Sequence, residues 1–327
     1  MRLFATSKLW CKASALPLPN KFCKKFESLM GRFLWAGKLE RLQLNEIKND
    51  RSDGGLSLPC VFSKANALFL SQTCRLLHHD PASKQYGHVK YWIGLHLREY
   101  FPVMANGPHA ELVSPYFQHM RLLLTDGLVL GDINAGTLGR VTANDLYQNY
   151  TSSFPPPKVV FKFDVDWPLV WMRLDCPVLD PLGREYLFMI VHNIVPTRER
   201  LHLKMNMVNS PNCVVCNVRE DTTHMFTECI MVREAWGWAR LRILSLLPAD
   251  CAGTSNFEIL NLMFLKHVMD KEIVWFLGVV LEFIWAEKLG RNRNVKLEHL
   301  IGQTQLKYKA NQFSKKPSLA HIVGISL

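Results

Sequence analysis

The sequence predicts a mainly α-helical chain that carries one small metal-binding knuckle. Apolar residues recur at helical spacing within the first hundred residues. The most apolar run, Ile273–Trp285, has the composition of a buried helix, and three cysteines and one histidine cluster between positions 213 and 229. We expect four segments: a basic helical segment at 1–100, a mixed spacer at 101–157 that ends in a proline-rich linker, a metal-binding domain at 158–250, and helices with a basic tail at 251–327.

Net charge is the most informative feature of the overall composition. Across 327 residues, 39 Lys and Arg stand against 28 Asp and Glu, giving a net charge of +11, and 48% hydrophobic residues suffice for a substantial core. Residues 1–51 hold eleven Lys and Arg against four acids, so most of the surplus lies there. This balance suits a polyanionic partner, although a basic composition alone does not identify one.

The cysteines and the apolar runs indicate the compartment. Nine cysteines at irregular spacing do not form the framework of a secreted disulfide scaffold, so we expect reduced thiols and a nuclear or cytoplasmic location. Arg2, Lys8 and Lys12 interrupt the start of the chain, which does not resemble a signal peptide. Ile273–Trp285 contains Glu282 and is too short to span a bilayer, so we expect no membrane partner.

The first segment predicts two helices separated by a glycine turn. A helix is expected over 20–35. It should bury an apolar stripe and carry, on its other faces, cations that could contact a phosphate backbone. A turn at Asp53-Gly54-Gly55 and a helix over 60–77 follow. The stripe consists of Phe22, Phe26, Leu29, Met30 and Phe33, and the cations are Lys21, Lys24, Lys25 and Arg32.

The spacer and the start of the third segment contain clear local signals. Thr142 and Asp145 have the spacing of a capping box, and Ser152–Pro157 breaks every regular element, so it is the best linker candidate. Further on, Trp167, Trp171 and Leu174 predict an apolar helix face, and a helix over 183–195 is expected to end before Pro196. We expect His192 to be a packed core residue. Asp164 and Asp166 are expected to be solvated carboxylates rather than catalytic ones.

The central motif is Cys213, Cys216, His224 and Cys229 in the order C-x2-C-x7-H-x4-C, the ligand set of a closed tetrahedral zinc site. The two-residue gap suits a tight knuckle, and the His–Cys gap suits a helical turn followed by a break. Four protein ligands leave no open position for water, so the zinc is expected to be structural. The alternative is that these are reduced core cysteines and a packed histidine. The polar stretch 217–223 disfavours a buried segment.

The region around this motif resembles a known family. The run from Pro196 to Trp236 is similar to the zinc-binding region that follows the polymerase domain in LINE-type, non-LTR retrotransposon reverse transcriptases. A Pro-Thr-Arg segment leads into the first cysteine pair. The other residues that stand where the family pattern has them are Glu220, Thr223, His224, Cys229 and Trp236.

A second resemblance lies near the N-terminus. The phrase from Phe33 to Lys38, the basic Arg41, Gly54-Gly55-Leu56 and Leu58-Pro59 resemble the thumb of the same polymerases. The two matches occur in the family's order and cover roughly residues 8–78 and 140–240. The Y-x-D-D turn that carries the catalytic aspartates has no counterpart, and the sequence has no Asp-Asp pair, so we expect no enzyme activity.

The resemblance implies a non-catalytic nucleic-acid-binding fragment. We expect largely sequence-independent contact with RNA or DNA, and association with a polymerase core supplied by the full-length element. The candidate contact residues are Lys24, Lys25, Arg32, Lys38, Arg41, Arg198, Arg200, Arg291 and Arg293. Arg198 and Arg200 fit a solvated turn equally well.

The C-terminal segment is expected to contain helices over 235–247 and 258–291, followed by a basic, disordered and solvated tail over 288–316. Its aromatic residues are expected to be core rather than base-stacking platforms. They are Trp236, Trp238, Trp275, Phe276, Phe283 and Trp285.

Two other functions stay open. In the first, the zinc knuckle stabilises a helical protein-interaction module that does not bind nucleic acid, and whose basic surface binds acidic proteins or has no partner. In the second, the chain is a decayed reading frame without a selected role.

Overall fold

The structure is a computed structural model, and its described residues are mainly helical, as the sequence predicts. It describes residues 2–35, 42–78, 83–97, 113–129, 140–152, 154–248, 251, 253–263, 271–287 and 295–310. These residues contain no β-strand, and one isolated antiparallel bridge joins Asn212 and Arg219.

The chain divides into two compact units. Unit 1 comprises Met1–Asn49 and Ser57–Pro155, and unit 2 comprises Asp50–Leu56 and Pro156–Leu327. The passage between Pro155 and Pro156 lies inside the segment predicted as a linker. The finer division into four segments stays a prediction.

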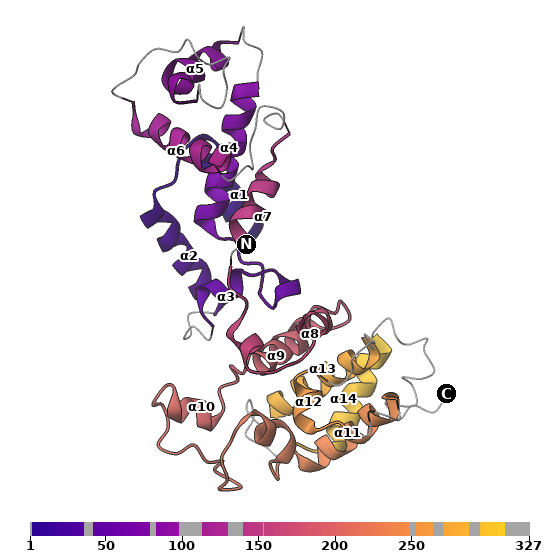
Figure 1. The fold of residues 1–327 in the computed structure, drawn as a ribbon. Coiled ribbons are helices and arrows are strands. Elements are labelled where there is room, and N and C mark those ends of the chain that lie inside the picture. The colour runs from indigo at the N-terminus through magenta and orange to yellow at the C-terminus, as the bar shows by residue number, and fades with distance from the viewer. Residues whose placement is uncertain are drawn as a thin grey trace. The chain divides into compact units, whose positions relative to one another are not determined.

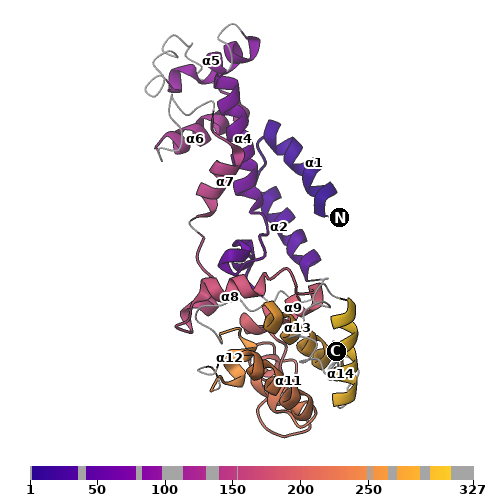
Figure 2. The ribbon, with the colours of Figure 1, turned by 90° about the vertical axis from the view of Figure 1, so that its right-hand side faces the viewer.

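Unit 1 is a set of helices packed around α4. Because α4 is buried on most sides, it provides much of the core, including Phe69, Leu70 and Cys74. Figures 1 and 2 show α1 and α2 alongside α4, and α6 and α7 also contact it. The helices are α1 (Arg2–Ala15), α2 (Asn20–Leu34), α3 (Leu44–Lys48), α4 (Val61–His78), α5 (Lys84–Leu97), α6 (Pro115–Val129) and α7 (Ala143–Thr151).

Helix α2 forms where the sequence predicts it, but its buried face is not the predicted apolar stripe. Cys23, Glu27 and Gly31 are buried, whereas Phe22, Leu29 and Phe33 are exposed. The Glu27 carboxylate accepts hydrogen bonds from Lys48 Nζ at 2.9 Å and from the Val61 amide at 2.6 Å. This buried ion pair joins α2, α3 and the start of α4, and it turns the helix so that three large apolar side chains face outward.

Unit 2 is organised around the apolar helix α13 (Lys271–Trp285), which is buried over almost its whole length, as the sequence predicts. It contacts α8, α9, α11, α14 and η4. The other elements are η1 (Arg51–Asp53), η3 (Lys158–Phe161), α8 (Trp167–Leu174), α9 (Pro181–Val191), α10 (Arg198–Leu203), the π-helical turn η4 (His224–Glu228), α11 (Arg233–Leu246), α12 (Asn256–Leu260) and α14 (Leu297–Ala310).

The short segment Asp50–Leu56 packs on α8 as part of unit 2. Gly54 is buried, has a φ of +78° and faces the indole of Trp171, while Arg51 forms an ion pair with Asp175 at 2.9 Å. Trp171 stacks between Trp167 and His192, with ring centroids 4.9 and 5.3 Å apart. His192 is therefore a packed core residue, as predicted, and it forms a hydrogen bond with the backbone of Gly54.

Two predicted helices end earlier than expected, for the same reason. Helix α9 stops at Val191 instead of reaching residue 195, because Asn193 adopts a left-handed φ of 53° and Ile194 donates back to the Met189 carbonyl. The single helix expected over 258–291 is broken in the same way. Leu262, with a φ of 58°, ends α12.

The basic run at the C-terminus also differs from expectation over its described part. Residues 297–310 form α14, whose buried residues Leu300, Thr304 and Tyr308 fall one turn apart. Lys307 reaches Asp180 Oδ2 at 2.7 Å and Glu282 Oε2 at 2.5 Å. The expectation of a disordered tail is wrong here, because the apolar spacing within the basic run is sufficient to dock a helix.

Other local predictions are confirmed. Thr142 and Asp145 form the capping box of α7, and Trp167, Trp171 and Leu174 are buried on α8. Among the aromatic residues of the C-terminal segment, Trp236, Trp275, Phe276 and Phe283 are buried, and Trp238 and Trp285 are half-buried. None of the helices in the described ranges combines the length and apolar character needed to cross a membrane.

Candidate metal centre

The first pair of candidate ligands sits on a tight turn in unit 2. The Asn217 amide donates to the Cys213 carbonyl at 2.9 Å, and the Cys213 amide donates to the Val218 carbonyl at 2.7 Å. Asn217 takes a left-handed φ of 55°, which asparagine tolerates better than most residues. These bonds close the turn and place the Cys213 and Cys216 side chains on one side.

The second pair comes from the turn η4 and the residue that ends it. His224 begins η4, and the Cys229 amide donates to the His224 carbonyl at 2.8 Å, which brings the two side chains together. The Asp221 carboxylate accepts the His224 amide at 2.7 Å and fixes the start of this turn. The prediction of a helical turn followed by a break is confirmed. The role of Asp221 was not predicted, although an Asp three residues before His224 is a capping signal.

The four side chains converge. One potential ligand atom from each of Cys213, Cys216, His224 and Cys229 lies within 4.8 Å of the others. Cys229 Sγ is 3.9 Å from Cys213 Sγ and 3.7 Å from Cys216 Sγ. Two thiolates bound at about 2.3 Å to one tetrahedral zinc stand about 3.8 Å apart, so the sulfur spacing suits that ion.

The surroundings of the ligands also fit a metal. His224 is buried, and its Nε2 atom has no hydrogen-bond partner, which is costly for a buried polar atom unless it coordinates an ion. The Ile230 amide points at Cys216 Sγ at 3.4 Å, a contact that stabilises a thiolate. Within the part of the chain that the structure describes, this is the only group of Cys, His, Asp or Glu side chains arranged to hold a metal.

Comparison with known families agrees with this geometry. Residues 164–236 match the family described as zinc-binding in reverse transcriptase. The match contains α8, α9, α10 and all four ligands, and it ends at Trp236 on α11. No curated protein matches the chain. Residues 164–236 are thus similar to a zinc-binding region of reverse transcriptases, and the three cysteines and the histidine form a site for one structural zinc ion.

Within the matched region, the segment that precedes the first cysteine pair braces the knuckle. Thr197 caps α10 by accepting the Arg200 amide, and Arg198 Nε donates to the Asn212 carbonyl at 2.6 Å. The buried Glu220 carboxylate accepts the Arg198 amide at 3.1 Å. Arg198 and Glu220 thus hold the two ends of the knuckle against the start of α10.

The candidate nucleic-acid contacts fall into three groups. Lys24, Lys25 and Arg32 are exposed on α2. Arg198 and Arg200 are half-buried and donate to backbone carbonyls of Asn212 and Asn193, so part of their bonding capacity serves the fold. Lys38, Arg41, Arg291 and Arg293 lie outside the described residues.

Lys25 and Arg32 share one side of α2, because seven residues correspond to about two helical turns. Lys24 is turned by roughly 100° from Lys25.

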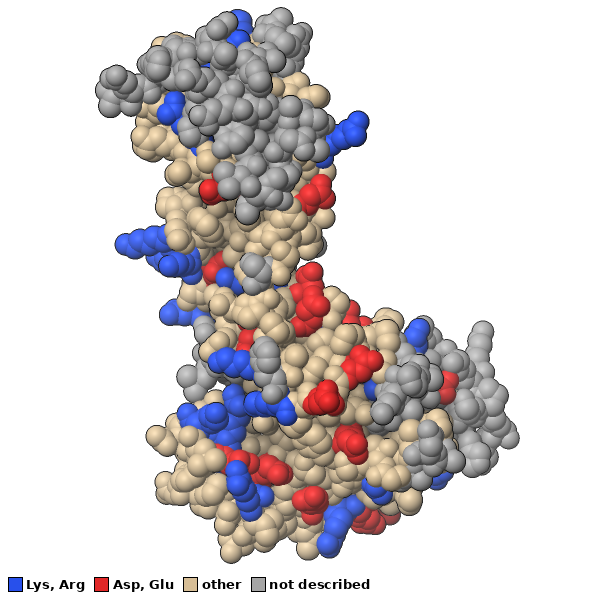
Figure 3. All heavy atoms as spheres, viewed as in Figure 1, with Lys and Arg blue, Asp and Glu red and all other residues tan. Residues whose placement is uncertain are grey.

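Figure 3 shows cations and carboxylates mixed over the visible face of unit 2, so charge of one sign does not cover that face.

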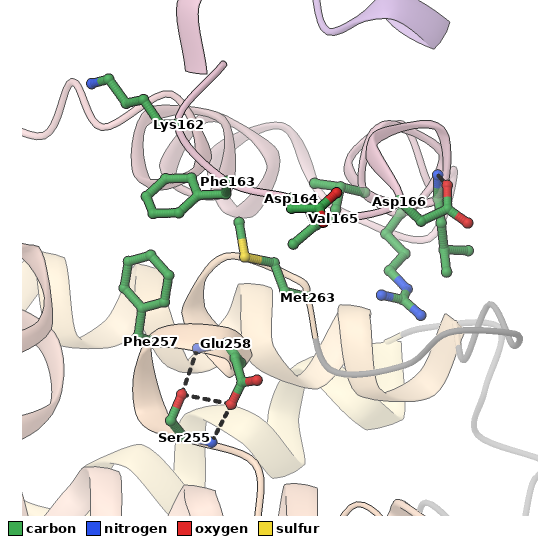
Figure 4. Close-up of a pocket in the computed structure, with 12 residues that line it drawn as sticks. Lys162, Phe163, Asp164, Val165, Asp166, Ser255, Phe257, Glu258 and Met263 are labelled. Carbon is green, nitrogen blue, oxygen red and sulfur yellow. Dashed lines mark hydrogen bonds between the residues drawn. The ribbon is translucent and has the colours of Figure 1, made fainter. Parts of the chain in front are cut away.

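A hollow of about 700 Å³ in unit 2 is lined by the segment before α8 and by α12. Figure 4 shows Phe163, Phe257 and Met263 facing one another across it. Two of its three carboxylates take part in the fold: Asp166 accepts the Leu169 amide at the start of α8, and Glu258 completes a capping box with Ser255. Asp164 and Asp166 are exposed, as predicted for solvated groups.

Proposed function

We propose that this chain is a non-catalytic, nucleic-acid-binding part of a LINE-type retrotransposon reverse transcriptase, C-terminal to the polymerase core. The observation that carries the proposal is the convergence of Cys213, Cys216, His224 and Cys229 inside a region that matches the zinc-binding family of reverse transcriptases. The resemblance of the N-terminal phrases to the thumb supports the LINE type and the order of the parts.

The zinc ion has a structural role in this proposal. A closed site with four protein ligands does not activate water, and in such sites the free energy of metal binding is also free energy of folding. The ion holds the knuckle against α10 and α11, whose positions depend on Arg198, Glu220 and Cys229.

Helix α2 supplies the nucleic-acid contacts. Lys21, Lys24, Lys25 and Arg32 are exposed, and the one acidic residue of the helix, Glu27, is buried against Lys48. The exposed charged side chains of α2 are therefore all cationic. Such a surface binds phosphates by releasing counterions and does not read the base sequence.

The test is the salt dependence of binding to an RNA–DNA duplex. We expect the logarithm of the affinity to fall linearly with the logarithm of the salt concentration. Each phosphate contact contributes a slope of about 0.9 for a B-form DNA duplex. Replacing Lys24, Lys25 and Arg32 by Gln should reduce the slope by about 2 to 3. Exposed cations elsewhere, Lys84, Lys296 and Lys309, provide a matched triple Gln control that should change it little.

A rival function is a zinc-stapled helical module that binds proteins. Weak binding with a flat salt dependence, or equal effects of the two triple variants, would favour this rival over nucleic-acid binding. A decayed reading frame predicts in addition that the chain is not produced from its own transcript. Association with a polymerase core is tested by co-purification with the polymerase segment of the same element.

A further inference from the structure

The outer face of α2 presents a row of large apolar side chains. Phe22, Leu29 and Phe33 are 44%, 53% and 61% exposed. Phe26 is half-buried: it packs partly against the cluster of Leu9, Cys23 and Val61, and it stacks on Phe22 with ring centroids 6.2 Å apart. We name Phe22, Phe26, Leu29 and Phe33 the α2 seam.

The spacing of the seam distinguishes it from ordinary surface leucines. Single exposed apolar residues, such as Leu306 on α14 at 61% exposure, occur on most proteins and need no explanation. The seam residues are separated by four, three and four positions, the repeat with which one helix packs along another. A partner helix that lies along α2 would insert its own apolar residues between them.

The charged residues beside the seam indicate which charge its partner carries. Lys25 and Arg32 are exposed and lie seven residues apart, in the position that flanks such a seam. The opposite border, at Cys23 and Met30, faces the core of unit 1. Because Glu27 is buried, no exposed carboxylate on α2 offsets these cations.

We infer that the α2 seam is a docking site for an acidic amphipathic helix of a partner protein. The partner has apolar residues at the spacing of the seam and Glu or Asp at the flanking positions that meet Lys25 and Arg32. Nucleic acid fits the seam less well, because phosphates satisfy the cations but leave the large apolar side chains in water. The inference does not depend on the proposed nucleic-acid function, but Lys25 and Arg32 belong to both proposals, so this partner and nucleic acid would compete for that side of α2.

The probe is a synthetic helix of three heptads with Leu at the seam positions and Glu at the flanking positions, titrated onto the full chain. A second peptide carries Lys in place of Glu. We expect the Glu helix to bind at least about tenfold more tightly than the Lys helix, because Lys25 and Arg32 repel the latter.

Two variants separate the seam from its charged border. Replacing Phe22 and Phe33 by Ser should weaken the Glu helix at least about tenfold, whereas Leu306→Ser, at an equally exposed site, should leave its affinity unchanged. Exchanging Lys25 and Arg32 for Glu should reverse the preference, so that the Lys helix now binds more tightly. All of these side chains are exposed, so the variants are expected to fold.

Three outcomes would overturn the inference. The first is that neither peptide binds. The second is that the Phe22 and Phe33 variant binds the Glu helix as tightly as the parent does, which would indicate charge attraction alone. The third is that the exchange of Lys25 and Arg32 for Glu does not reverse the preference between the two peptides. Loss of RNA–DNA duplex binding in the Phe22 and Phe33 variant, with no binding of the Glu helix, would assign the seam to nucleic acid instead.

Discussion

Gly54 lies against the indole ring of Trp171 so closely that a Cβ atom built on Gly54 would stand 2.6 Å from Cζ2 of that ring. Gly54 belongs to the phrase that resembles a polymerase thumb, and Trp171 belongs to the matched zinc-binding region. Two stretches that resemble one family and lie far apart in the sequence thus pack within one unit.

Replacing Gly54 by Ala should lower the free energy of unfolding by about 3 kcal/mol, because a left-handed φ and an overpacked contact each cost about 1 to 3 kcal/mol. Urea denaturation measures the change. The matched control is Gly237→Ala on α11, where a Cβ meets nothing within 4 Å and helix propensity favours Ala by roughly 0.5 to 1 kcal/mol. Equal effects of the two substitutions would show that the contact with Trp171 is not tight.

Burial lowers the pKa of His192 from 6.5 to about 4, against a hydrogen bond with the Gly54 backbone that raises it. Between these values the unfolded chain binds more protons than the folded one. The burial of neutral His192 therefore costs no stability above pH 6.5. The free energy of unfolding falls by about 3 kcal/mol as the pH drops toward 4. An NMR titration of the imidazole tests the pKa directly, and a midpoint near 6.5 would refute it. Comparing the pH dependence of the parent and His192→Asn separates this effect from acid release of zinc.

The ion pair of Glu27 and Lys48 is buried, with side-chain exposures of 7% and 8%. Glu27→Gln should destabilise unit 1 by about 3 to 5 kcal/mol, because it leaves the Lys48 charge buried without a counter-charge. Replacing both residues by Met should cost much less. A double variant as unstable as the single one would contradict this, because the loss would then not come from an unpaired Lys48 charge.

Lys307 bridges two carboxylates at the base of α14. Burial pushes the pKa of Asp180 up, but the Lys307 hydrogen bond brings it below its ordinary value; burial raises the pKa of Glu282. Because these groups are only half-buried, Lys307→Met should cost about 1 kcal/mol at pH 7. The loss should shrink as the pH falls toward 4, since Glu282, whose pKa is raised, then takes up a proton while Asp180 stays ionised. Thermal melts at both pH values measure this, and a loss that grows in acid would contradict it.

Local signals in the sequence predict local structure well here. The zinc ligands, the Thr142 capping box and the buried faces of α8 and α13 depend on residues a few positions apart, so spacing alone reveals them. The contact of Gly54 with Trp171 joins distant residues, and no local pattern indicates it.

The orientation of α2 shows the limit of periodicity. The spacing of Phe22, Leu29 and Phe33 correctly indicates one side of a helix, but it does not say which side is buried. That side is chosen by the ion pair of Glu27 with Lys48 on another helix, a contact that the sequence of α2 does not contain. For the same reason Arg198, which suited a solvated turn, turns out to bind the Asn212 carbonyl.

The zinc content of the purified chain tests the central claim most directly. We expect one zinc ion per chain in the parent and in Cys176→Ser, since Cys176 is buried but is not one of the four ligands. Cys229→Ser should lose stoichiometric zinc, because it removes a thiolate from a closed site. A parent chain without zinc, or a Cys229→Ser variant that keeps as much as Cys176→Ser, would contradict a structural zinc at these four residues.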